Sequence, residues 1–146
     1  MRYPVSRRLA LSIAAIACLT KAAYAAPVLE ADAKAVRAVV EAQMKAFAAD
    51  DARRAFSYAA PNIHEMFGTP DNFLAMVKSA YPMVHRPSSV AFMRPDLREN
   101  GEVFQRVQIT DSSGSSWLAT YALNRQKDKS WRITGCVVEQ NKGRVA

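Results

Sequence analysis

The fold of this chain follows most directly from residues 103–125, VFQRVQITDSSGSSWLATYALNR. Apolar side chains recur with a period of two before and after the polar segment 111–116, and this period is typical of strands with one buried face. In the first strand, Val103, Val107 and Ile109 share one face. In the second strand, the corresponding face carries Trp117, Ala119, Tyr121 and Leu123. The stretch therefore predicts an antiparallel hairpin.

One strand precedes this hairpin and another follows it. Residues 90–97 have the composition of a strand but contain Pro95. Because proline cannot donate to a ladder, we expect an edge strand or a bulged strand there. A second turn at 127–129 leads into a strand over 131–139. The C-terminal half therefore predicts an antiparallel meander of about four strands.

The N-terminal half has helical periodicity instead. In residues 32–49 the apolar side chains recur at steps of three and four, which predicts an amphipathic helix. Residues 52–60 predict a second helix that Pro61 ends. Residues 62–67 are too short a segment to assign.

A third helix begins at the segment GTPD, residues 68–71, and ends at Pro82. Thr69 is the expected N-cap, and Pro70 occupies the first helical position, where its missing N–H costs nothing. Helices followed by a meander predict an α+β fold, with the N-terminal helices packed on one face of a curved antiparallel sheet. We expect a single domain over residues 26–146.

Residues 1–25 are typical of a cleavable secretory signal peptide. A basic start is followed by the apolar run 9–19, which is shorter than the ~20 residues needed to cross a bilayer core, so we expect no membrane span. Small side chains at Ala23 and Ala25 favour cleavage after Ala25, which predicts a periplasmic or secreted protein. Two alternatives stay open: the run is the first helix of a cytosolic protein, or Cys18 is lipidated.

The same leader accounts for much of the positive charge. The chain has 20 basic and 13 acidic residues, a net charge of +7, and four of the basic residues lie within 1–25, so the remainder carries +3. The basic clusters at 53–54 and 127–129 are typical of a solvated helix face and a hairpin turn. We therefore expect no nucleic-acid partner.

Cysteine and histidine usage is sparse. Once Cys18 is lost with the leader, Cys136 is the only cysteine, so no intrachain disulfide is expected. We expect Cys136 to be a buried small residue rather than a nucleophile, with an interchain disulfide as the alternative. His64 and His85 are the only histidines, and no spacing resembles a set of metal ligands. We therefore expect neither a metal nor a cofactor.

Several short motifs resemble known families. FAADDA at 47–52 and KDKSWRI at 127–133, in this order of elements, resemble the NTF2-like superfamily, also called the SnoaL-like or cystatin-like roll. Four further segments resemble an uncharacterised bacterial family, domain of unknown function 4864: GTPDNF (68–73), YPMVHRPSSV (81–90), WLATY (117–121) and WRITGCV (131–137). The resemblance implies a curved sheet wrapped by helices into a cone. It implies no single activity, because the superfamily includes isomerases, hydrolases, binding modules and dimerisation domains.

Candidate site residues lie mainly where the helices end. His85 and Arg86 stand between Pro82 and Pro87, whose fixed φ angles stiffen the segment, and Tyr81 is adjacent. Arg86 with Tyr81 could hold an anion. The alternative is a rigid connection whose charges face solvent. The acidic residues after position 90 all fall at strand ends or turns, which argues against an acid–base site on the sheet.

The remaining candidates are aromatic or partly polar. His64 is a second candidate, although a solvated histidine at a helix end is the expected alternative. Tyr121 could direct its hydroxyl into a pocket near Trp117, or pack across strands against Trp131. The predicted core or pocket lining consists of Phe67, Phe73, Met76, Phe92, Trp117, Tyr121, Trp131 and Ile133.

Three functions of different classes remain open. The first is an exported binding module whose apolar pocket holds a small apolar or amphipathic ligand. The second is an interaction domain that forms a homodimer through the outer face of the sheet. The third is a small isomerase or hydrolase, which the lack of acids on the strands disfavours.

Overall fold

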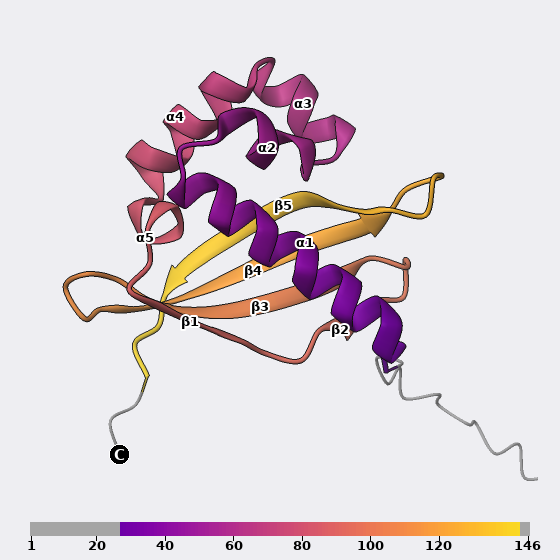
Figure 1. Ribbon diagram of the computed structural model, residues 1–146. Coiled ribbons are helices and arrows are strands. Elements are labelled where there is room, and N and C mark those ends of the chain that lie inside the picture. Colours follow the sequence, from indigo (N-terminus) through magenta and orange to yellow (C-terminus); the bar gives the residue numbers. More distant parts are fainter. Residues whose placement is uncertain (1–26, 144–146) are drawn as a thin grey trace, which may run out of the picture.

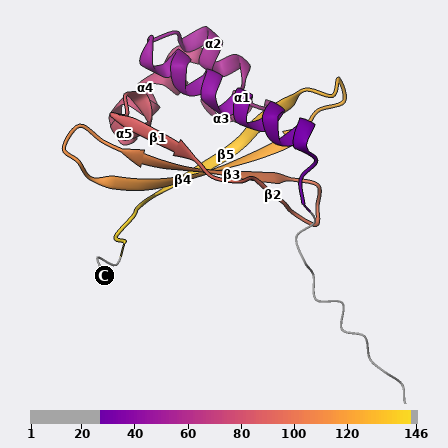
Figure 2. The same ribbon diagram turned by 60° about the horizontal axis from the view of Figure 1, so that its bottom comes forward.

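The computed structural model describes residues 27–143, and in them helices cover one face of an antiparallel sheet (Figures 1 and 2). The helices are α1 (Glu30–Ala48), α2 (Ala52–Ser57), α3 (Pro61–Phe67), α4 (Pro70–Ala80) and α5 (Pro82–His85). The strands are β1 (Ser89–Phe92), β2 (Asp96–Leu97), β3 (Val103–Thr110), β4 (Ser116–Arg125) and β5 (Trp131–Gln140). The predicted α+β class, with N-terminal helices packed on the sheet, is confirmed. The predicted leader and Cys18 lie outside the described residues.

Within residues 27–143 the sheet has five strands rather than about four. Its order is β1-β3-β4-β5, and β2 also pairs with β3. The single strand predicted over 90–97 is two short strands, β1 and β2, separated by residues 93–95. Pro95 has no N–H to donate, so it can end a strand at the sheet edge but cannot continue the ladder.

A bulge in β5 sets which of its side chains face the helices. Ala122 pairs with Gly135 and Leu123 pairs with Ile133, so Thr134 is an extra residue without a partner in β4. One extra residue reverses the alternation of a strand. Ile133 before the bulge and Cys136 after it therefore share the face that packs against the helices.

The helix boundaries follow local caps, and two predictions near residue 60 are wrong. Thr69 accepts a hydrogen bond from the Asn72 N–H at 3.2 Å, which confirms the predicted start of α4. The second helix ends at Ser57 rather than Ala60, and Pro61 begins α3 instead of ending a helix. Proline is favoured at the first position of a helix, where its missing N–H costs nothing, so Pro61 starts α3.

The connection from α2 to α3 is fixed directly to β5. The Ala60 N–H donates to the Ile133 carbonyl at 2.8 Å, and the Ile133 N–H donates to the Tyr58 carbonyl at 2.9 Å. Asn62 donates from its side chain to the carbonyl of Thr134 at 2.8 Å, at the bulge. These bonds hold the start of α3 beside the bulge.

The core lies between α1, α4 and the covered face of the sheet. Of the predicted core residues, four are buried: Phe73, Tyr121, Trp131 and Ile133. The other four are partly buried and pack against the core: Phe67, Met76, Phe92 and Trp117. Within residues 27–143 no helix is long and apolar enough to cross a membrane.

Candidate functional site

A cavity of about 310 Å³ opens between the helices and the β4–β5 half of the sheet. This volume is at the low end of the range for small-ligand sites. The helical side of its lining consists of Gln43, Phe47, Ala59, Ile63, Met66, Phe67, Phe73, Met76, Val77, Tyr81 and Val84. The sheet side consists of Tyr121, Ile133, Thr134, Gly135, Cys136 and Val138.

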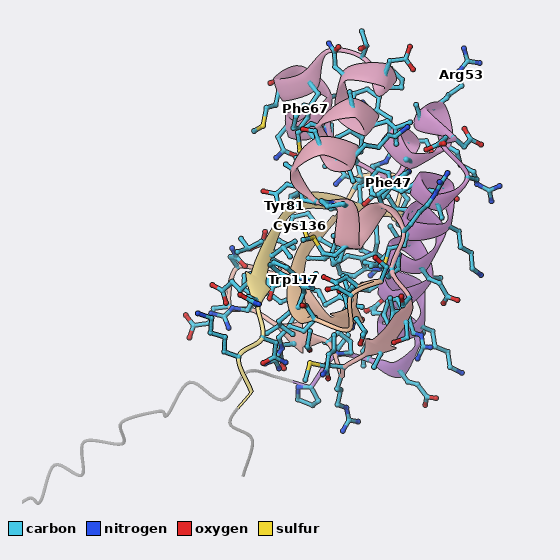
Figure 3. The ribbon with its side chains drawn as sticks, turned by 90° about the vertical axis from the view of Figure 1, so that its left-hand side faces the viewer. Phe47, Arg53, Phe67, Tyr81, Trp117 and Cys136 are labelled. Carbon is cyan, nitrogen blue, oxygen red and sulfur yellow. The ribbon has the colours of Figure 1, made fainter. Side chains whose placement is uncertain are left out.

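The opening of the cavity lies between α3 and β5. Met66 on α3 is 70% exposed, and Cys136 on β5 is also exposed, although both line the cavity. Figure 3 shows Cys136 and Tyr81 close to the boundary between the sheet and the helices. Ligands could therefore enter past side chains that are already in contact with solvent.

Four aromatic rings hold the helical wall in place. The ring of Phe73 lies 5.5 Å from Phe47, 5.5 Å from Phe56 and 5.3 Å from Phe67, measured between ring centroids. Tilted pairs at these separations stabilise beyond the area they bury. Phe73 thus joins α1, α2, α3 and α4 at one point beside the cavity.

Tyr121 and Cys136 are cross-strand partners in β4 and β5, and both line the cavity. Tyr121 is 1% exposed, and its hydroxyl has no hydrogen-bond partner within the described part of the chain. Burial raises the pKa of Tyr121 well above its ordinary value, so the phenol stays protonated. Burial also raises the pKa of Cys136 to about 12. The exposed surface of Cys136 is part of the concave cavity wall, where surrounding protein replaces much of the water, and this reconciles exposure with a raised pKa.

The lining contains no charged side chain among residues 27–143. Two of its other polar groups form hydrogen bonds within the protein. Gln43 donates from Nε2 to the Ala55 carbonyl at 3.1 Å, and the Thr134 hydroxyl donates to the Ala122 carbonyl at 3.1 Å. The cavity wall is therefore uncharged and mostly apolar, and it includes the buried Tyr121 hydroxyl, which has no acceptor within residues 27–143.

Of the predicted site residues, the structure brings Tyr81 and Tyr121 to the cavity and leaves His85 and Arg86 outside its lining. His85 Nε2 lies 2.7 Å from Asp50 Oδ1, and Arg86 Nη2 lies 3.1 Å from Asp50 Oδ2. The charge of Arg86 is thus paired with a carboxylate of its own chain. This pairing joins α5 to the turn after α1.

The two predicted tryptophans also lie outside the lining. Trp117 donates from Nε1 to Asp111 at 2.8 Å. Hydrogen bonds to its carboxylate lower the pKa of Asp111 to about 2. The bond from the Ser113 hydroxyl has the largest effect, and the bond from Trp117 comes next. Trp131 packs under the guanidinium of Arg125, 5.5 Å from the ring centroid.

Three expectations about neighbours are wrong. Tyr121 pairs across the strands with Cys136 rather than with Trp131, because the β4–β5 hairpin places Trp131 opposite Arg125, four residues beyond Tyr121. Cys136 is an exposed cavity residue rather than a buried core residue, and the bulge brings it to the face that lines the cavity. His64 is not a solvated histidine: it stacks on Phe56 at 4.0 Å, and its Nε2 lies 2.6 Å from the Phe56 carbonyl.

Residues 27–143 contain no cluster of three or more histidine, cysteine or acidic side chains that could hold a metal ion. Phe67 of α3 was predicted as core or pocket lining, but sequence reasoning missed Ile63 and Met66 of the same helix, which also line the cavity. The signal for that helix was Pro61 in the first helical position.

No curated protein and no solved structure matches this chain in a comparison with known proteins. A family model matches residues 29–146, which include every cavity residue and the whole described sheet. This match bears out the family resemblance of the four motifs. The chain belongs to the family described as "Domain of unknown function (DUF4864)".

Proposed function

We propose that this domain binds a small, largely apolar ligand in the cavity between α3, α4 and β5. The observation that supports the proposal most is an open cavity of about 310 Å³ whose described lining carries no charged side chain. Sites of this kind are concave, mostly apolar and provided with few polar groups. An exposed Met66 at the opening fits the same role, because methionine adapts its shape to varied apolar partners.

Two further parts of the proposal concern the superfamily to which the domain belongs and the cellular location of the protein. We place the domain in the NTF2-like superfamily, with the cavity as the interior of its cone. We also propose that the protein acts in the periplasm or outside the cell after removal of residues 1–25. N-terminal sequencing of protein recovered from the periplasm would read Ala26 first. Retention of Met1 on cytoplasmic protein would contradict the export.

A pair of adjacent substitutions tests ligand binding. Val138 lines the cavity, whereas Val137 is 60% exposed and points to the other face of β5. Val138→Trp should fill the cavity and abolish the fluorescence increase of Nile red, an uncharged apolar dye. Val137→Trp is the matched control, with the same change of volume one residue away, and should bind the dye as the unaltered protein does. Equal loss in both variants, or in neither, would contradict binding in this cavity.

The second candidate function, homodimerisation through the sheet, has its own observation. The helices cover one face of the sheet, and the other face is uncovered in residues 27–143 (Figure 2). That face includes Val137, which is 60% exposed, and the half-buried Phe104 and Leu118. Sedimentation velocity of the protein and of Val137→Glu tests this candidate. A dimer that Val137→Glu dissociates supports it, and a monomer at every concentration excludes it.

A further inference from the structure

We infer that the ligand is uncharged and carries a hydrogen-bond acceptor at its inner end, such as a carbonyl oxygen, which receives the proton of the Tyr121 hydroxyl. This inference rests on the proposed binding function and narrows it to a chemical class. It follows from two properties of the cavity: an unsatisfied donor and the absence of charged side chains in its described lining.

The unsatisfied donor is the hydroxyl of Tyr121. Its oxygen is buried and has no hydrogen-bond partner in the structure of residues 27–143. A buried hydroxyl without a partner is costly, and most such groups in proteins are satisfied. A ligand that supplies an acceptor would recover this lost free energy, so Tyr121 favours ligands that carry one.

The neighbours of Tyr121 do not satisfy it from within the protein. Gln105, its partner on β3, directs its side-chain amide to the carbonyls of Met93 at 2.7 Å and Arg106 at 3.0 Å. Cys136, its partner on β5, lies close enough for its thiol to contribute to the raised pKa of Tyr121, after burial. A thiol is only a weak acceptor, and the pair does not form a hydrogen bond of good geometry. The oxygen of a ligand beside Cys136 would be a stronger acceptor than either neighbour provides.

The polarity of the site fixes the direction of the hydrogen bond. Burial holds the pKa of Tyr121 above its ordinary value, so the phenol keeps its proton and donates. The Cys136 thiol is likewise protonated near neutral pH. The buried Oε1 of Gln105 also has no partner within residues 27–143, but Gln105 is not part of the cavity lining. At the cavity wall beside Tyr121, an amine or alcohol proton on the ligand would therefore meet only the weak acceptor of the Cys136 thiol, whereas a carbonyl oxygen would find a donor.

The missing charges exclude ionised ligands. An ion taken from water into an apolar cavity needs a counter-ion and further hydrogen bonds to offset its desolvation. The lining in the described residues contains no aspartate, glutamate, lysine, arginine or histidine. Arg86, the cation expected from the sequence near Tyr81, is bound to Asp50 instead. A carboxylate or ammonium ligand would therefore be disfavoured.

Three probes of one shape test the inference: acetylnaphthalene, ethylnaphthalene and naphthoate, substituted at the same ring position. The first offers a carbonyl acceptor, the second offers none, and the third is a charged carboxylate at neutral pH. Isothermal titration calorimetry with the unaltered protein and with Tyr121→Phe measures the affinity of each protein for each probe, six affinities in all. Cys136→Ala is a second variant, which keeps the Tyr121 hydroxyl and removes the thiol beside it.

The expected ranking in the unaltered protein is acetylnaphthalene above ethylnaphthalene, with naphthoate weakest. Tyr121→Phe should weaken acetylnaphthalene binding by about 3- to 10-fold, the usual range for one neutral hydrogen bond, and leave ethylnaphthalene unchanged. Cys136→Ala should keep the preference for the ketone. Equal binding of both neutral probes, or a preference that survives Tyr121→Phe, overturns the inference but leaves the binding function standing. Tight naphthoate binding overturns the inference in the same way, and failure of every probe to bind overturns the binding function itself.

Discussion

His85 Nε2 lies 2.7 Å from Oδ1 of Asp50, a residue 35 positions earlier in the chain. Asp50 also accepts from Arg86 Nη2 at 3.1 Å and lies 3.6 Å from Lys78 Nζ. Its backbone φ angle is +53°, a left-handed conformation that aspartate and asparagine adopt more readily than most residues. One carboxylate thus connects the turn after α1 with α4 and α5, which form part of the helical wall of the cavity.

This connection predicts a stability that depends on acid pH. The hydrogen bond from His85 is the largest of the effects that lower the pKa of Asp50, with Lys78 and Arg86 adding to it. The ionised carboxylate therefore stabilises the fold above the unfolded-state pKa of about 3.9, and this stabilisation is lost as the pH falls through the lower folded-state pKa. Urea unfolding below pH ~4 should show the free energy of unfolding falling less steeply in Asp50→Asn than in the unaltered protein. Asn is chosen because it keeps the left-handed turn. Identical pH profiles would contradict the role of Asp50.

Tyr121→Phe should not weaken the fold. Removal of a buried hydroxyl that has no partner relieves an unfavourable burial, so we expect the free energy of unfolding to rise by about 1 kcal/mol or stay unchanged. Tyr81→Phe is the control, at a half-buried tyrosine, and should change it by less than ~0.5 kcal/mol. Chemical denaturation measures both. A loss above ~1 kcal/mol in Tyr121→Phe would mean that the hydroxyl is satisfied in solution.

Phe73→Ala should be strongly destabilising. The ring contacts Phe47, Phe56 and Phe67, and its removal takes away a side chain shared by four helices. Truncation of a buried phenylalanine typically costs about 3–5 kcal/mol in free energy of unfolding. Met66→Ala, at the exposed opening, should cost less than ~0.5 kcal/mol. Equal effects at both positions would contradict the proposed packing of the helical wall.

Cys136 should react slowly with iodoacetamide despite its exposure. Burial in the cavity wall raises the pKa of its thiol from 9.0 to about 12, and the thiolate is the reactive form. At pH 8 the folded protein should therefore contain roughly a thousand-fold less thiolate than an unfolded chain. Alkylation followed by mass spectrometry should be fast in urea and slow in its absence. A folded protein that reacts as fast as the unfolded chain would contradict the environment described for Cys136.

Local patterns predicted most of the fold. The alternation in residues 103–125 identified β3 and β4 and the faces they bury, because a period of two belongs to each strand alone. Thr69 and Pro70 identified the start of α4, because a helix cap also depends only on residues that are neighbours in the sequence. Tyr81 and Tyr121 were both proposed for the site from the sequence, and both line the cavity.

The parts that could not be predicted depend on pairing between distant segments. The bulge at Thr134 is a property of the β4–β5 register, and it decides that Cys136 rather than Val137 faces the helices. Likewise, the pairing of Arg86 with Asp50 requires the turn after α1 to meet α5, 36 residues later in the chain. The period of a helix or strand carries no information about which distant segments of the chain come into contact.

The most direct measurement of ligand binding in this cavity is a crystal structure of the protein grown with acetylnaphthalene. The ring should lie between α4 and β5, in contact with Phe73 and Val138, with its carbonyl oxygen within hydrogen-bond distance of the Tyr121 hydroxyl. A cavity filled by the protein's own side chains, with the probe absent or bound only on the outer face of the sheet, would contradict the account.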